Sequence, residues 1–203
     1  MNTKKLQITF IHETGHHIAN ELNYRVFKFN RKTESIFLYP SNSGDFFDGQ
    51  IKVANNNAEH YHPENTSLEY IRIFYGCLFE CLYREIEISK CLCEVAKPSD
   101  IKECLCKGRV DYHDMAHITM SRNIKNRFDW WRYLTVEYFS LMKNNLDLFQ
   151  TVFELKVQDF ILKQNNDYVE INLDQLNIAL EPFLIDHKKD FEMAVENLKK
   201  LNI

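Results

Sequence analysis

Two histidines four residues apart lie inside a stretch that has the apolar spacing of a helix. His12 and His16 enclose Glu13, and apolar residues recur at three- and four-residue steps over 3–22 without a proline. Residues four apart project from the same face of an α-helix, so both imidazoles can bind a single Zn²⁺. Glu13 can then face the open coordination position and take a proton from zinc-bound water, whose pKa the metal lowers toward ~7.

Gly15 lies in the middle of the same helical pattern. A glycine there costs about 1 kcal/mol relative to alanine, so we expect another backbone or a substrate to approach the helix closely at this point. The alternative is a partly exposed amphipathic helix with ordinary histidines. We favour the metal site, because the motif and the helical pattern coincide.

A catalytic zinc site needs a third protein ligand, and spacing alone does not select it. His17 is the weakest candidate, because it lies about 100° round the helix from His16. The other candidates are carboxylates and the residues His60, His62, Asp111, His113, Asp114 and His117. His113 and His117 share a helical face, and one of them is a candidate hydrogen-bond donor to an oxyanion; the alternative is that both are surface histidines.

The rest of the chain is predicted to be mostly α (α+β), with a small antiparallel sheet near the N-terminus. We expect strands within 24–54, at 24–29, 35–39 and 49–53, and a polar loop at 54–66. Helices are expected from about 67, near 110–114, and at 129–144, 146–164 and 188–201; the segment 173–184 is ambiguous. A chain of 203 residues is expected to form a single domain, 1–203.

The net charge and the hydropathy of the sequence restrict the partners and the cellular location that we expect. The formal net charge is −4 without a basic stripe, which speaks against nucleic acid. Charges interrupt every apolar run before ~18 residues, so no membrane span or signal peptide is expected. We therefore expect a cytoplasmic protein with reduced cysteines. The sequence contains two Cys-x-Cys pairs, Cys91 with Cys93 and Cys104 with Cys106. They could bind a structural metal, form disulfides or remain free thiols, and we favour free thiols.

Three segments together resemble the peptidase domain of FtsH-type ATP-dependent zinc metalloproteases. His12-Glu13-Thr14-Gly15-His16-His17 resembles the HEAGHA-type zinc motif of that family. Gly76-Cys77-Leu78-Phe79-Glu80 resembles its Gly-Arg-Ala-Ala-Glu helix, and Gly108 to Ala116 resembles its Gly-Ala-x-Asn-Asp-Leu segment. The resemblance implies a zincin-like helical domain over 1–165, with 166–203 as an unmatched C-terminal tail. It also implies that the third zinc ligand is Asp114.

Glu80 lies near Leu78 and Leu82 on the apolar side of the expected long helix. There it is a candidate to hold a zinc-binding imidazole in one tautomer. The alternative is an ion-pair partner for an arginine or lysine.

The function expected from these patterns is that of a zinc metallopeptidase acting on polypeptides, with His12, His16 and Asp114 as ligands and Glu13 as general base. The sequence contains no Gly-x-x-x-x-Gly-Lys-Ser/Thr phosphate loop, so an ATPase of that type is expected only on a separate chain. Assembly of this chain into a homo-oligomer is also compatible with the sequence. The alternative function is a zinc-binding interaction protein of the same fold with reduced turnover, because four positions depart from the family pattern: Thr14, His17, Cys77 and His113.

Overall fold

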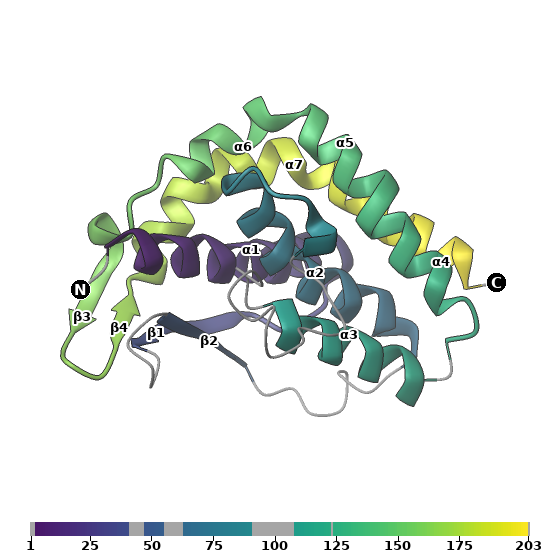
Figure 1. Ribbon diagram of the computed structural model, residues 1–203, viewed down its shortest axis with the longest axis horizontal. Coiled ribbons are helices and arrows are strands. Elements are labelled where there is room, and N and C mark those ends of the chain that lie inside the picture. Colours follow the sequence, from purple (N-terminus) through teal and green to yellow (C-terminus); the bar gives the residue numbers. More distant parts are fainter. Residues whose placement is uncertain (1–2, 41–46, 55–62, 91–107, 123, 203) are drawn as a thin grey trace.

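The computed structural model describes residues 3–40, 47–54, 63–90, 108–122 and 124–202. Two long helices form the centre of the molecule (Figure 1), α1 (Thr3–Phe27) and α2 (Thr66–Tyr83). Almost every side chain of α2 is buried, which is typical of a helix that other elements surround on all sides. α1 is buried without a break from Thr9 to Asn20, although this stretch is rich in polar residues.

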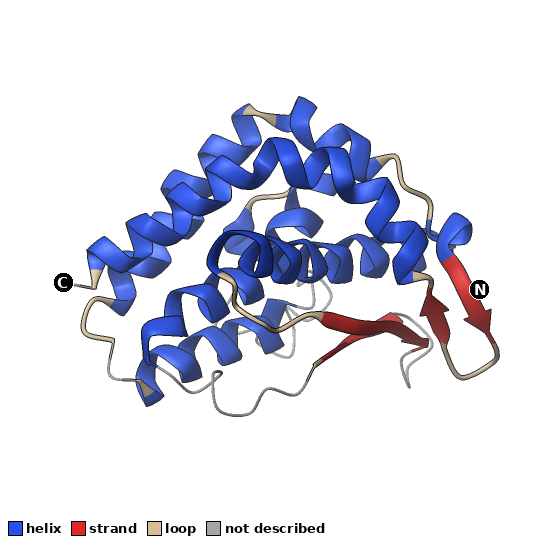
Figure 2. Ribbon diagram, turned by 180° about the vertical axis from the view of Figure 1, so that it is seen from behind, coloured by secondary structure: helices blue, strands red, loops and turns tan. Residues whose placement is uncertain are grey.

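The sheet has four strands, all antiparallel, in the order β2-β1-β4-β3. The strands β1 (Thr33–Pro40) and β2 (Phe47–Val53) follow α1, whereas β3 (Ile161–Gln164) and β4 (Val169–Ile171) come from the C-terminal part of the chain. Ile36 and Leu38 of β1 are completely buried. The sheet lies beside α1 (Figure 2), and β2 forms an edge near the middle of that helix.

The remaining helices form an arch over α1 and α2 (Figure 1). One layer of the arch is a continuous rod of α4 (Arg127–Arg132), a π-helical segment (Tyr133–Tyr138) and α5 (Phe139–Asn144), followed by α6 (Leu146–Phe153). The second layer, which runs alongside the first, is α7 (Leu173–Leu201), and it begins where the Asn172 side chain accepts a hydrogen bond from the backbone N–H of Gln175. Below the central pair lies α3 (Gly108–Ser121).

The structure confirms the mostly helical α+β class and the strands at 35–39 and 49–53. The strand expected at 24–29 is wrong, because α1 continues to Phe27, whose ring packs on Phe191 of α7. Lys28, with φ of 58°, then ends the helix. Contact with a distant helix therefore overrides the local alternation of apolar residues.

One expectation for the C-terminal part is also wrong. The helix expected at 146–164 ends at Phe153, since 161–164 pairs with β4 across a turn in which the Asn165 side chain accepts backbone N–H groups of Asp167 and Tyr168. The helix expected at 188–201 is confirmed, and it is continuous with the ambiguous segment 173–184 in one helix that contains Pro182. The boundary at residue 165, between the peptidase-like region and the C-terminal tail, falls in the β3–β4 turn. Beyond it, α7 shares the core with α1 and α2.

In the described part of the chain, no helix combines the length and the apolar character that crossing a bilayer requires.

Candidate metal centre

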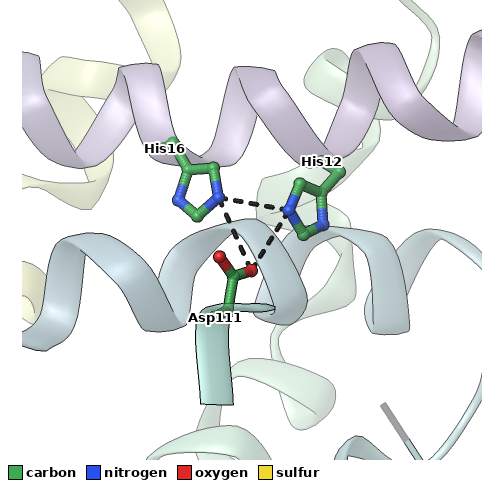
Figure 3. A group of neighbouring side chains, drawn as sticks. All are labelled: His12, His16 and Asp111. Carbon is green, nitrogen blue, oxygen red and sulfur yellow. Dashed lines mark hydrogen bonds and ion pairs between the residues drawn. The ribbon is translucent and has the colours of Figure 1, made fainter. Parts of the chain in front are cut away.

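His12, His16 and Asp111 meet between α1 and α3 (Figure 3). One ligating atom from each lies within 4.8 Å of the other two, and the three side chains are largely buried. Nε2 of His12 lies 3.1 Å from Nε2 of His16 and 3.2 Å from Oδ2 of Asp111. Nε2 of His16 lies 3.6 Å from the same oxygen. This buried group could bind a metal ion.

Two glycines allow the helices to approach closely enough to form this group. A Cβ at Gly15 would collide with the backbone oxygen of Tyr75, so α1 and α2 pack backbone to backbone there. A Cβ at Gly76 would occupy the place of the His16 imidazole and lie 2.8 Å from Nε2 of His12. The expectation that a backbone approaches Gly15 is therefore confirmed, and Gly76 leaves room for the nitrogen atoms of both histidines.

The outer nitrogen of each imidazole has a partner of its own. Nδ1 of His12 lies 3.1 Å from Oε2 of Glu80, and Nδ1 of His16 lies 2.9 Å from the backbone oxygen of Arg72. A backbone oxygen and a carboxylate are acceptors, so each Nδ1 carries a hydrogen and donates it. Each Nε2 of a neutral imidazole then presents a lone pair toward the other histidine and Asp111. Such pairing of the outer nitrogen is characteristic of metal-binding histidines.

With both imidazoles neutral, three electron-pair donors face one point and repel one another, unless a metal ion or a proton on Nε2 of His12 lies between them. The pKa values of the three groups reflect this arrangement. Burial lowers the pKa of His12, but its hydrogen bond and charge interaction with Asp111, helped by Glu80 and Glu13, raise it to about 10. Burial dominates for His16 and lowers its pKa to about 4. Burial raises the pKa of Asp111, but the two histidines and Cys77 bring it down to about 2. Without a metal ion, His12 is therefore protonated and pairs with the Asp111 carboxylate.

The structure brings Glu80 to His12 and adds a partner that the sequence analysis did not identify. Oε1 of Glu80 accepts a hydrogen bond of 2.6 Å from the Arg84 guanidinium, while Oε2 faces His12. Glu80 therefore contacts both a histidine imidazole and an arginine, the two kinds of partner weighed for it. The four-residue spacing of Glu80 and Arg84 on a helix could have indicated this pair.

Asp114, the expected third ligand, is not brought to the histidine pair, and the carboxylate that the structure places there is that of Asp111. Asp114 is exposed on α3, as are His113 and His117. Asp111 lies on the inner face of α3 with Met115 and Thr119, which are 1% and 2% exposed. Their four-residue spacing was a signal in the sequence that could have separated the two aspartates.

Glu13 is buried, but its carboxylate does not belong to the group formed by His12, His16 and Asp111. It is 5% exposed, and its carboxylate lies against Gly49 of β2, where a Cβ would collide with it. Its negative charge contributes to the raised pKa of His12, so it acts on the site electrostatically. The edge strand β2 thus packs on α1 at the residue expected to be the general base.

Other residues considered in the sequence do not join the centre. His17 is completely buried on another side of α1, and its Nε2 donates a hydrogen bond of 2.8 Å to Oδ1 of Asn177 on α7. His60, His62 and the two Cys-x-Cys pairs lie outside the described residues. Cys77, noted as a departure from a family pattern, donates a hydrogen bond to Asp111. Burial raises the pKa of this thiol well above its ordinary value, which keeps it protonated.

Comparison of the chain with profiles of known protein families, with curated proteins and with solved structures gives no match. The function is therefore argued from the geometry of this centre.

Proposed function

We propose that the protein is a zinc-dependent hydrolase of peptide bonds, with His12, His16 and Asp111 as metal ligands. The observation that carries this proposal is the buried group of two imidazoles and one carboxylate, in which the outer nitrogen of each imidazole has an acceptor. Two histidines and one carboxylate are a ligand set found in catalytic zinc sites. A bound Zn²⁺ would supply Lewis-acid polarisation of a carbonyl and a lowered pKa for water.

The chain's own residues would perform the remaining tasks. Glu80 and the Arg72 backbone oxygen hold the two imidazoles in the orientation that presents Nε2. Glu13 would accept a proton on its carboxylate from the attacking water and return it to the leaving amine. The strand β2, which is the outermost strand of the described sheet on one side and packs on α1 at Glu13, would align an extended peptide by strand addition. The resemblance of the sequence to FtsH-type peptidase domains supports the same reaction.

The test is the substitution Glu13→Gln, which removes the base and keeps the size of the side chain. We expect this variant to bind about one zinc per chain, as the parent does, and to lose at least a hundredfold in hydrolysis, the lower range for a general base. The substrate is casein, a largely unfolded protein that needs no separate ATPase. The matched control is Glu21→Gln, two turns further along α1, which keeps both properties. Equal rates for Glu13→Gln and the parent would refute the proposed role.

A second function, zinc binding for interaction without turnover, is favoured by one observation. The Glu13 carboxylate is packed against the backbone of β2, whereas a general base must reach the reacting water. Full zinc occupancy without cleavage of casein or of a peptide library would select this alternative. Cleavage that depends on Glu13 would exclude it.

A further inference from the structure

The Asp111 carboxylate needs an orienting partner. Asp111 lies in the first turn of α3, and its side chain is 13% exposed, more than that of either histidine. An aspartate side chain has two rotatable bonds, and only one orientation directs Oδ2 at both Nε2 atoms. Fixing it costs conformational entropy unless another group already holds the carboxylate.

Cys77 provides this contact from the third helix of the site. It lies on α2 directly after Gly76, the residue against which both imidazoles pack, and its side chain is completely buried. Its thiol donates a hydrogen bond of 3.3 Å to Oδ2 of Asp111. This oxygen is the same atom that lies 3.2 Å from Nε2 of His12 and 3.6 Å from Nε2 of His16. The thiol and the two imidazoles therefore all contact the same oxygen of the carboxylate.

We propose that Cys77 is a positioning residue that holds Asp111 as a metal ligand and thereby sets the affinity of the centre for its metal. The group of converging ligating atoms consists of His12, His16 and Asp111, and Cys77 lies outside it among the described residues. Its role is thus to donate to a ligand and not to coordinate. Loss of such outer hydrogen bonds typically lowers metal affinity 10- to 100-fold. The inference rests on the proposed metal site but not on peptide hydrolysis.

The experiment compares the zinc affinity of the full chain with that of four variants, by competition with a chromophoric chelator. Cys77→Ala and Cys77→Val remove the donor, the first with a smaller side chain and the second with a larger one. We expect either to weaken zinc binding 10- to 100-fold. Cys77→Ser retains a donor and should restore most of the affinity. Cys81→Ala is the matched control, because Cys81 is also buried on α2, one turn further on, and should leave the affinity unchanged.

The absorption spectrum of the Co²⁺-loaded protein separates positioning from coordination. We expect no thiolate-to-metal charge-transfer band in the parent, and a changed ligand-field spectrum in Cys77→Val that Cys77→Ser reverses. A merely structural role of the thiol would lower the unfolding temperature of the metal-free protein without these changes. A charge-transfer band that disappears in Cys77→Ser would make Cys77 a ligand and overturn the proposal.

Equal zinc affinity of Cys77→Val and the parent would also overturn it. A parent that binds zinc and cleaves no peptide contradicts the peptidase function alone, because the affinity comparison can still be made. A parent that binds neither Zn²⁺ nor Co²⁺ overturns both proposals.

Discussion

At the scale of single residues, two aspartates three positions apart on α3 differ in whether they face the histidines or the solvent. Asp111 and Asp114 are three residues apart, yet only Asp111 faces the imidazoles of His12 and His16. The difference arises because the inner face of α3 continues through Met115 and Thr119, whereas Asp114 belongs to the exposed face. A separation of three positions within a helical turn thus decides which carboxylate lies beside the histidines.

This difference gives a prediction about metal content. We expect Asp111→Asn to lose most of the zinc bound per chain, because an amide is a weaker ligand than a carboxylate and carries no charge to offset that of the ion. Asp114→Asn, its matched control on the exposed face, should retain the zinc of the parent. Zinc per chain is measured by atomic emission after dialysis against metal-free buffer. Loss of zinc in Asp114→Asn with retention in Asp111→Asn would reverse the assignment.

At the scale of elements, α2 connects the metal centre to a second buried polar cluster. The Tyr75 hydroxyl lies 2.6 Å from the Tyr138 hydroxyl of the π-helical segment and 2.8 Å from Nε2 of His187 on α7. His187 is completely buried, and Phe149 and Phe183 pack on its ring. Oδ2 of Asp190 lies 4.0 Å from Nδ1 of His187. Burial lowers the pKa of His187 to about 3.

The lowered pKa of His187 predicts a loss of stability in acid. In the unfolded chain this histidine has a pKa near 6.5, so the unfolded state binds a proton first as the pH falls. The contribution of neutral His187 is therefore complete above pH 6.5 and is lost progressively toward pH 3. Between pH 7 and pH 5 the loss amounts to about 2 kcal/mol in the free energy of unfolding.

Urea unfolding of the parent and of His187→Gln at several pH values measures this loss. Glutamine does not titrate and retains an acceptor for the Tyr75 hydroxyl. The burial of His16 and His17 lowers their pKa values as well, so the parent loses stability from several groups in this range. The difference between the two proteins isolates His187, and it should shrink by about 2 kcal/mol from pH 7 to pH 5. Parallel pH profiles would contradict the assignment.

At the scale of the whole molecule, the C-terminal segment is part of the core. The buried side chains of α7 include Leu176, Leu180, Phe183, Leu184, Phe191, Ala194, Val195 and Leu198. Polar contacts add to this packing, since Arg25 of α1 binds both carboxylate oxygens of Glu181, and His17 binds Asn177. β4 also completes the sheet beside β1. The helix that carries both histidines is thus held in place by α7.

We therefore expect a chain that ends at residue 165 to lack cooperative unfolding. It would leave the apolar faces of α1, α2 and α6 exposed and β1 without one neighbour, a loss far larger than a domain's net stability of about 5–15 kcal/mol. Thermal denaturation followed by circular dichroism measures the transition. A chain that ends at residue 201 is the control and should unfold as the parent does. A sharp transition in the shorter chain would show that 1–165 folds by itself.

The sequence by itself determined the helical class, the two strands β1 and β2, and the pair His12 and His16 on one helix face, because all of these follow from local periodicity. The cost of a glycine in the middle of a helical pattern also predicted that another backbone approaches α1 at Gly15. Local periodicity failed at 24–27 and at 161–164, where Phe191 and β4, both distant in the chain, supply the deciding contacts. Only the tertiary structure decided among the candidate third ligands and connected Cys77 and Arg84 to the site. The physical reason is that the packing of three helices brings these side chains together. The relative rotation of α1, α2 and α3 depends on contacts between segments that are distant in the sequence.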